Sequence, residues 1–319
     1  MSSQTKKNPF LFLVGCPRSG TTLLNRIIDA HPSIAMMRRE QHWIPRLFLK
    51  RIGVDQDGMV TADLLSELFR DRRFTKLKIP FSQLEPLIGS RNRSYAEFVR
   101  SIFDLYSERE GKFLVGEKTP GNGLHIPVLH SLWPAAKIVH LVRDGRDVCL
   151  SAIQWQKSEK LKERFRVWRE NPVLGAAYWW RWHVGVGRKA GATLGPALYY
   201  EIRYENLVRN PEQECRNLCE FLGIAYSERM PAFHEGKTKA GRDAKHAWIG
   251  ITPGLRDWRR DMEPRNVALF EAAAGDVLQE LGYDLASQRD ANLLNHVQPL
   301  KASFAEDAQS RIRYVPEDW

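Results

Sequence analysis

The sequence lacks any apolar stretch that could cross a bilayer. A transmembrane helix needs about 20 consecutive apolar residues, and the apolar run near the N-terminus, "PFLFLV" at 9–14, is much shorter. That run also leads directly into a glycine-rich loop, so it reads as a buried first strand rather than a signal peptide. We therefore expect no membrane span.

Cysteine is also scarce. No CxxC pair occurs, which argues against a zinc site, and two of the cysteines are one helical turn apart, which is poor geometry for a disulfide. The four are Cys16, Cys149, Cys215 and Cys219. This usage suits a reducing compartment, and we predict a cytoplasmic protein that needs no metal.

Internal repeats and low-complexity segments are absent, and the composition is that of a soluble globular chain. Its 48 Lys and Arg exceed its 38 Asp and Glu, giving a net charge of +10. Nucleic acid, an anionic membrane or a polyanionic small molecule would each fit this charge. The basic residues are scattered, with one local run at 70–78. This pattern favours a local anion site over a nucleic-acid stripe.

The hydropathy pattern alternates between strands and helices, which predicts an α/β fold with a central parallel sheet flanked by helices. We expect one domain over 1–285, with a helical insertion at about 46–110, and a C-terminal tail over 286–319 that is packed on the domain or loosely attached. The expected strands are 10–15, 111–118, 136–144 and 197–205. The main helices are expected at 21–30, 123–133, 146–155, 173–190, 210–224 and 266–284, with further helices within 61–110.

The glycine-rich loop "VGCPRSGTTLLNRI", at 14–27, has the Gly15-to-Gly20 spacing of a Walker loop but lacks its lysine. Loop amides and a helix N-terminus form an anion site. Thr21 and Thr22 can add hydroxyl donors, and Arg18 adds a charged guanidinium group. Without the lysine that reaches β- and γ-phosphates, the loop suits a single phosphate or phosphosulfate better than a metal-bound triphosphate.

A second anion motif follows the third expected strand, in "IVHLVRDGRDVCLSAI" at 138–153. Arg143 ends the strand, and Asp144 reads as a helix N-cap with Asp147 completing an acidic capping box. Ser151 lies two turns along the same face. Arg143 and Ser151 can therefore bind the same phosphate group.

The two motifs in this order resemble the sulfotransferases that use 3′-phosphoadenosine 5′-phosphosulfate (PAPS), with local similarity to the tyrosylprotein and bacterial branch. The resemblance implies a P-loop-like fold, PAPS as sulfonate donor, adenosine 3′,5′-bisphosphate as product and no metal. The cofactor-binding residues that it implies are Arg18, Ser19, Gly20, Thr21, Thr22, Arg143, Ser151, Tyr204, Lys245 and Arg256.

Three of these assignments rest on local matches. "GEKTP" at 116–120 resembles a family motif whose lysine, here Lys118, points at the transferring sulfonate; otherwise it is a surface lysine beside a turn. In "YENL" at 204–207, the resemblance puts Tyr204 near the adenine, and the alternative is a strand-end aromatic packed on the next helix. The family's mobile C-terminal loop corresponds to 245–264, where we favour Arg256 and Lys245 as phosphate ligands.

The catalytic base is expected to be Glu40. "EQHWIP" at 40–45 resembles the "E-x-x-x-IP" segment of tyrosylprotein sulfotransferases, whose glutamate is the base. Glu40 could instead be a helix-terminal carboxylate paired with Arg38 or Arg39, and His42 and His125 are rival bases.

Several neighbouring residues have simpler interpretations. Glu117 is expected to pair with Lys118 or an arginine. His140 reads as a core histidine with a backbone partner. Trp179 and Trp182, which share a helix face, are expected in the core, and Trp180 is assigned near the acceptor pocket.

The function expected from the sequence is sulfonate transfer to an acceptor hydroxyl of a phenol, a sugar or a peptide tyrosine, with Arg18 and Lys118 stabilising the departing nucleotide. A small-molecule kinase with a degenerate P-loop would need a strand-end aspartate for magnesium, and Asp144 is better used as a cap. A polyanion-binding protein would explain the +10 charge but not the two motifs. A homodimer is left open, and no nucleic-acid partner is expected.

Overall fold

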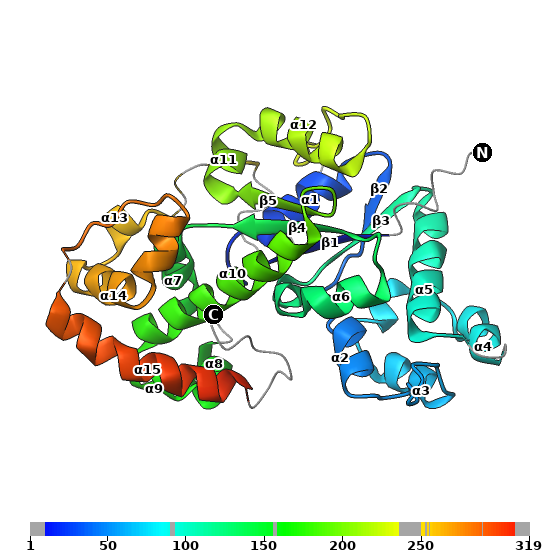
Figure 1. The fold of residues 1–319 in the computed structure, drawn as a ribbon. Coiled ribbons are helices and arrows are strands. Elements are labelled where there is room, and N and C mark those ends of the chain that lie inside the picture. Colours follow the sequence, from blue (N-terminus) through cyan, green and yellow to red (C-terminus); the bar gives the residue numbers. More distant parts are fainter. Residues whose placement is uncertain are drawn as a thin grey trace.

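The computed structural model describes residues 10–89, 93–155, 158–235, 250–252, 254, 256–288 and 290–309. Five parallel strands form one sheet in the order β2-β3-β1-β4-β5, with helices on both faces (Figure 1). The strands are β1 (Leu11–Gly15), β2 (Ile34–Met36), β3 (Leu114–Lys118), β4 (Lys137–Val142) and β5 (Tyr199–Arg203). The predicted α/β class is confirmed, and β2, which is too short to give a hydropathy signal, is the strand the sequence did not reveal.

Helices connect and cover these strands. In the first half of the chain they are α1 (Thr21–Asp29), α2 (Trp43–Leu49), α3 (Asp63–Arg70), η2 (Thr75–Leu77), α4 (Phe81–Gly89), α5 (Tyr95–Glu110), η3 (Pro120–His125) and α6 (Ile126–Leu132). In the second half they are α7 (Gly145–Ile153), α8 (Ser158–Arg164), α9 (Arg166–Glu170), α10 (Pro172–Leu194), α11 (Tyr204–Arg209), α12 (Pro211–Leu222), α13 (Trp258–Asp261), α14 (Pro264–Glu280) and α15 (Ala291–Gln309). None of the helices in the described part of the chain is both long and apolar enough to span a membrane.

The central strand β1 is buried on both faces, as its uninterrupted apolar run predicts. Leu11 and Leu13 belong to a cluster that includes buried residues of α1 and α12. Phe10 and Phe12 point the other way, into a cluster with residues of α5 and α6; the rings of Phe10 and Phe103 lie 4.2 Å apart. The strand is thus fixed from both sides, and the loop that follows it starts from a rigid position.

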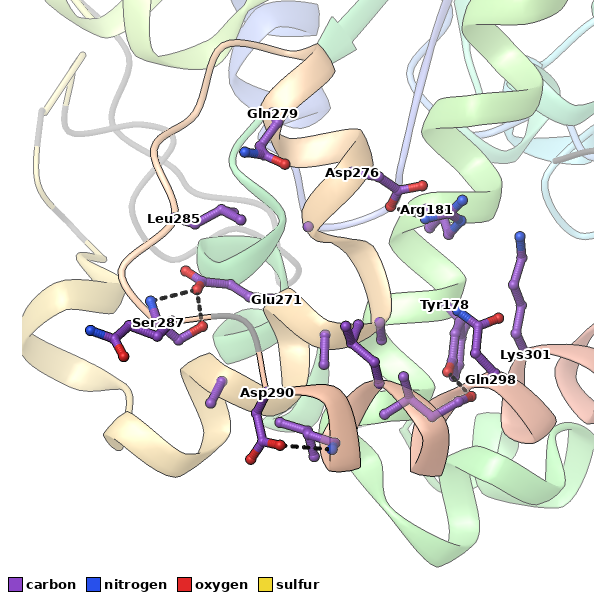
Figure 2. A pocket seen from close by; sticks show the side chains of 18 residues that line it. Tyr178, Arg181, Glu271, Asp276, Gln279, Leu285, Ser287, Asp290, Gln298 and Lys301 are labelled. Carbon is purple, nitrogen blue, oxygen red and sulfur yellow. Dashed lines mark hydrogen bonds and ion pairs between the residues drawn. The ribbon is translucent and has the colours of Figure 1, made fainter.

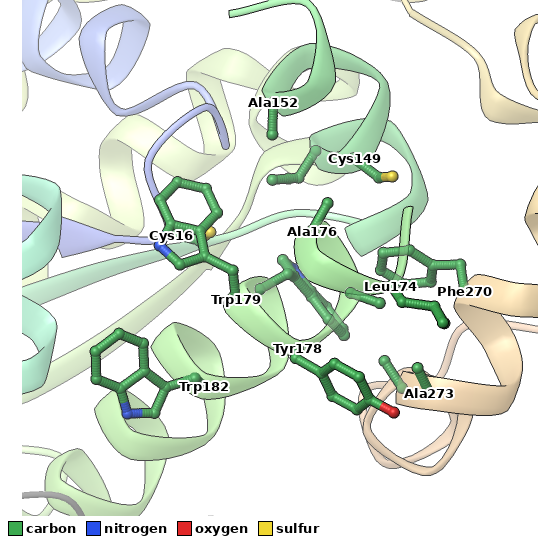
Figure 3. Packing of buried hydrophobic residues seen from close by; sticks show 14 of the residues in the cluster. Cys16, Cys149, Ala152, Leu174, Ala176, Tyr178, Trp179, Trp182, Phe270 and Ala273 are labelled. Carbon is green, nitrogen blue, oxygen red and sulfur yellow. The ribbon is translucent and has the colours of Figure 1, made fainter. Parts of the chain in front are cut away.

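A third apolar cluster packs α7, α10 and α14 together (Figure 3), and buried residues of α15 belong to it as well. Trp179 and Trp182 are each only 4% exposed, which confirms their expected place in the core. The helix α15 also contributes: Phe304 is fully buried, and its ring stacks on Phe165 at 4.5 Å. The first part of the expected tail is therefore packed, over 291–309.

All five strands run in the same direction, so their carboxyl ends lie along one edge of the sheet. The segment carrying Glu40 follows β2, Lys118 ends β3, and the glycine-rich loop follows β1. Arg143 follows β4, and Tyr204 follows β5. Residues spread over more than 160 positions of the sequence are thereby placed along one edge, where ligands of open α/β sheets usually bind.

Candidate active site

The glycine-rich loop turns tightly between β1 and α1. Gly20 has φ 104°, and a Cβ there would lie 2.6 Å from two carbons of the Tyr204 ring. A Cβ on Gly15 would lie 2.6 Å from the carbonyl oxygen of Leu141. Both positions therefore need glycine, the first for conformation and both for space.

Hydrogen bonds within the loop stabilise this turn. The buried hydroxyl of Ser19 donates to the carbonyl oxygen of Cys16 at 2.6 Å, and its amide donates to the same oxygen at 3.1 Å. Thr21 and Thr22 are the first two residues of α1, with Thr21 buried and Thr22 half-buried. The loop thus joins a helix N-terminus as expected, and its anion-binding role stays a prediction.

Arg18 links the loop to α7. Its φ of 79° is unusual for a residue with a side chain, and its Nε donates to Ser151 Oγ at 3.0 Å. The guanidinium also lies over the ring of Trp155, 5.4 Å from the centroid. Ser151 is therefore a neighbour of Arg18 as well as a predicted partner of Arg143, a proximity that the sequence did not indicate.

Arg143 lies in the turn between β4 and α7 and is almost completely buried. Its Nη2 donates to Asp147 Oδ2 at 2.9 Å, its guanidinium carbon lies 4.1 Å from the Tyr204 ring centroid, and its carbonyl oxygen accepts from Trp180 Nε1 at 3.0 Å. Within the described residues, its buried Nε has no hydrogen-bond partner. The assignment of Trp180 to the acceptor pocket is wrong: it is fully buried and supports the Arg143 turn.

The start of α7 is capped differently from the prediction. Asp144 is the N-cap, as expected, and accepts from the amide of Arg146 at 2.9 Å. Asp147 does not close a capping box, because the Asp144 amide donates to Glu205 Oε1 at 2.9 Å. Asp147 instead bridges Arg143 and the amide of Trp258, which donates to its Oδ1 at 2.9 Å.

Arg256 lies close to Arg143. Burial and then the charge of Arg143 lower the pKa of Arg256 from its usual value. Two guanidinium groups that raise each other's electrostatic energy form a natural site for an anion. Lys245, the other predicted ligand of this loop, lies outside the described residues.

Arg146 is a structural residue that the sequence analysis missed. It is fully buried, and its guanidinium donates to Asp144 (2.8 and 3.0 Å), to Glu271 (2.6 Å) and to the carbonyl oxygen of Asp284 (2.9 Å). The ring of Trp258 covers it at 3.7 Å. The second arginine of "RDGRD" was the available signal. These contacts fix α14 and the Trp258 segment against the start of α7.

Glu40, in the segment after β2, contacts Lys118, the last residue of the neighbouring strand β3. Lys118 Nζ donates to Glu40 Oε1 at 2.7 Å, and His42 Nε2 lies 3.0 Å from Glu40 Oε2. Burial alone would raise the pKa of Glu40, but the His42 hydrogen bond and the charge and hydrogen bond of Lys118 outweigh it and hold that pKa well below its usual value. Arg38 pairs with Glu110 instead, at 3.8 Å.

Two predictions about neighbouring residues are wrong. Glu117 does not pair with a cation in the described part of the chain. It accepts from three neutral donors, and burial raises its pKa to about 7. His140 is buried, but its partner is the hydroxyl of Tyr199 at 2.6 Å rather than the backbone. The rival base His125 is half-buried, and burial lowers its pKa to about 4.

Two cavities lie in the C-terminal part of the fold. One of about 340 Å³ lies between α10, α14 and α15, where Arg181 and Lys301 border it (Figure 2). Another of about 410 Å³ is lined by Arg146, Arg203 and Trp258. Neither is lined by the glycine-rich loop, Glu40 or Lys118. We therefore assign the candidate site from the strand ends rather than from these cavities.

The fold and the site define an α/β protein with a phosphate-loop-like turn and basic residues along the carboxyl edge of its sheet. Residues 9–228 match the sulfotransferase family, and the chain belongs to that family. This confirms the predicted resemblance.

Similar proteins agree with this classification. Protein-tyrosine sulfotransferase A of Caenorhabditis elegans is 24% identical over 95% of this chain and 74% of its own length. Carbohydrate sulfotransferase 1 of Danio rerio is 22% identical over 88% of this chain and 79% of its own length. Among solved structures, the sulfotransferase domain from the curacin biosynthetic pathway superposes with a TM-score of 0.62 at 21% identity, covering 87% of this chain and 99% of that domain. The structural likeness concerns the fold.

Proposed function

We propose that this protein transfers a sulfonate group from PAPS to an acceptor hydroxyl, with Glu40 as base and with Arg18 and Lys118 at the transferring group. One observation carries the proposal. A carboxylate, an ammonium and a glycine-rich loop follow three adjacent strands, β2, β3 and β1, at the same edge of the sheet. In-line transfer needs a base for the acceptor proton and cations for the leaving nucleotide, within reach of one another.

The residues present fit the donor. Gly20 carries no side chain where the loop meets Tyr204, and the amides of such a loop at a helix N-terminus can bind a phosphosulfate. Among the residues that the structure describes, none bonds the Nε of Arg143, and together with the nearby charge of Arg256 it suits a 3′-phosphate. Bound PAPS would supply the activated sulfonate. Ser151 and Tyr204 would contribute a hydroxyl and a ring beside the nucleotide.

The ion pair between Lys118 and Glu40 supports their two roles. In the free protein, the ammonium neutralises the carboxylate at 2.7 Å. An anion at the loop attracts the ammonium, and the carboxylate that loses this partner becomes more basic. His42, 3.0 Å from the other carboxylate oxygen, keeps Glu40 in place. Lys118 can therefore couple arrival of the donor to activation of the base.

The kinase alternative is less well supported. A magnesium-holding aspartate would need free oxygens at a strand end, but both oxygens of Asp144 are used, by Arg146 and by Trp258. A purely polyanion-binding role does not account for the half-buried Glu40–Lys118 pair. The names of the relatives include tyrosine and carbohydrate sulfotransferases, so we propose a tyrosine phenol or a sugar hydroxyl as acceptor.

The test is transfer of labelled sulfonate from PAPS to panels of tyrosine peptides and glycans. We expect Glu40→Gln to lower turnover at least about 100-fold, a typical contribution of a general base, while affinity for adenosine 3′,5′-bisphosphate changes less than about threefold. Glu212→Gln, which alters an exposed ion pair on α12, is the matched control. Unchanged turnover in Glu40→Gln would exclude Glu40 as base.

Donor recognition is tested separately by calorimetry. Arg143→Ala should reduce the preference for adenosine 3′,5′-bisphosphate over adenosine 5′-phosphate by at least about tenfold, the loss expected for one charge-assisted hydrogen bond. If the wild-type protein binds both nucleotides equally, the proposed 3′-phosphate site does not exist.

A further inference from the structure

A second carboxylate lies beneath the proposed base. Glu117 is the residue before Lys118 in β3, and it is fully buried. Its backbone pairs with Phe12 of the central strand, so its position is fixed by the sheet. A charged group in such a place is costly unless hydrogen bonds satisfy it, and the identity of its partners is therefore informative.

Three donors converge on this carboxylate from two segments. The Gln41 amide donates to Oε1 at 2.9 Å, and the Thr119 hydroxyl donates to the same oxygen. Asn122 Nδ2 donates to Oε2 at 3.1 Å. Gln41 directly follows Glu40, and Thr119 directly follows Lys118. Glu117 thus joins the segment that carries the proposed base to the turn that carries the proposed lysine.

The Glu40 segment is held on both sides of this bridge. The Gln41 side chain donates through Nε2 to the carbonyl oxygen of Arg39 at 2.6 Å and accepts from Trp43 Nε1 at 2.7 Å. Trp43 is fully buried at the start of α2. The position of Glu40 therefore depends on Gln41, and that of Gln41 depends on the Glu117 carboxylate.

We propose that Glu117 is a positioning residue: its ionised carboxylate fixes the segments of Glu40 and Lys118 relative to each other. The inference rests on the proposed function. All three partners donate their hydrogen atoms, so an ionised carboxylate can accept every bond. A protonated carboxyl group is a weaker acceptor and adds a hydrogen for which the Gln41 amide offers no acceptor, so protonation weakens the bonds that hold the Gln41 segment. The Gln41 amide is the partner that would move Glu40.

The groups around Glu117 determine the pH at which its carboxylate is protonated. Burial raises its pKa to about 7, the hydrogen bonds from Thr119 and Gln41 and the charge of His42 lower it, and the Glu40 carboxylate raises it. Asn122 is neutral, and the Lys118 ammonium is bonded to Glu40. Since the ionised form is the one that positions Glu40, activity should be present above neutral pH and be lost as the pH falls through this range.

Glu117→Gln changes the shape of the side chain little. It tests the bridge because an amide cannot accept all three hydrogen bonds. We expect turnover with PAPS to fall at least tenfold and the acidic limb near neutral pH to disappear, while affinity for adenosine 3′,5′-bisphosphate stays within threefold. Glu212→Gln is the matched control and should keep the wild-type profile. Wild-type turnover with the acidic limb intact in Glu117→Gln would overturn the proposal.

Thr119 provides a second, gentler pair of variants should Glu117→Gln fail to fold. Thr119→Val removes a hydrogen bond that lowers the Glu117 pKa, so the acidic limb should move to higher pH. Thr119→Ser keeps the hydroxyl and should restore the wild-type limb. If the limb lies at the same pH in both variants, Glu117 is not the group that controls it.

A readout without turnover separates this inference from the proposed function. The amide proton of Gln41 should change its NMR chemical shift with pH near 7 in the wild-type protein and stay constant in Glu117→Gln. If this titration occurs but no sulfonate is transferred, the proposed function fails while the bridge stands. An amide of Gln41 that does not titrate in the wild-type protein refutes the bridge, whatever the enzyme does.

Discussion

Replacing Gly20 by alanine tests the packing beneath the candidate donor site. The backbone at Gly20 has φ 104°, a conformation that costs a residue with a side chain roughly 1–2 kcal/mol. The new Cβ would also lie 2.6 Å from the Tyr204 ring, and overpacking of a buried site typically costs about 1–3 kcal/mol. We therefore expect Gly20→Ala to lower the free energy of unfolding by about 2–5 kcal/mol.

Two other glycines serve as matched controls for the backbone strain and for the overpacking. Gly58 also has a positive φ, 81°, but nothing lies within 4 Å of a Cβ built there. Gly58→Ala should therefore lose only the roughly 1–2 kcal/mol of backbone strain. Gly121 has neither strain nor a close neighbour, so Gly121→Ala should stay within about 0.5 kcal/mol of the wild-type protein.

Urea unfolding gives these free energies, and calorimetry with adenosine 3′,5′-bisphosphate gives the functional consequence. The Tyr204 ring that the new methyl would displace also lies 4.1 Å from the Arg143 guanidinium carbon. We expect the affinity of Gly20→Ala for the bisphosphate to fall at least about tenfold, equivalent to about 1.4 kcal/mol. A double-mutant cycle with Tyr204→Ala should recover roughly 1–3 kcal/mol of coupling free energy. If Gly20→Ala is no less stable than Gly58→Ala, the clash with Tyr204 is not significant.

Three further predictions concern the surroundings of the site. Arg146→Met leaves two buried carboxylates without their cation and should lower the free energy of unfolding by about 3–5 kcal/mol, whereas Arg216→Met, at an exposed ion pair, should cost at most about 1 kcal/mol; equal costs in urea unfolding would contradict the buried network. Trp258→Phe removes the indole donor to Asp144 at 3.0 Å and should cost about 1–3 kcal/mol, while Trp258→Ala should cost more because it also uncovers Arg146. Burial raises the pKa of the Cys149 thiol, so this thiol should react with a disulfide reagent only when the protein unfolds; rapid labelling of the native protein would show that it is accessible.

Features set by neighbouring residues follow from the sequence, and features set by distant contacts do not. The predicted N-cap of α7 at Asp144 follows from a local rule of capping and is observed, and the helix predicted at 210–224 ends at Gly223 in the left-handed conformation that favours glycine. The capping-box role of Asp147 failed, because Glu205, 61 residues away from Asp144 in sequence, took the amide that the box requires. The weak periodicity of 286–319 predicts only a packed or loosely attached tail, whereas the structure forms α15 around an interior proline and stabilises it by packing Phe304 against the core.

The candidate site shows the same division. Short sequence motifs identify the residue types of the site, because a glycine-rich loop or a strand-end arginine is recognised from neighbouring residues alone. The motifs do not identify the contact partners of these residues, because a parallel sheet brings together residues from different strands. Glu40 and Lys118 are 78 positions apart, and no rule of spacing connects them. The three neutral donors around Glu117 likewise come from segments that follow two different strands.

By itself, the sequence determined the alternation of strands and helices, the phosphate-loop-like turn without its lysine, and the motifs from which we predict the donor-binding residues. These features depend on neighbouring residues and on periodicity, which the chain carries in its order. Only the tertiary structure decided that Lys118 neutralises Glu40, that Asp147 joins Arg143 to Trp258, and that Glu117 is buried among donors rather than cations. Those contacts are set by strand order and by burial, and both emerge only when distant segments pack together.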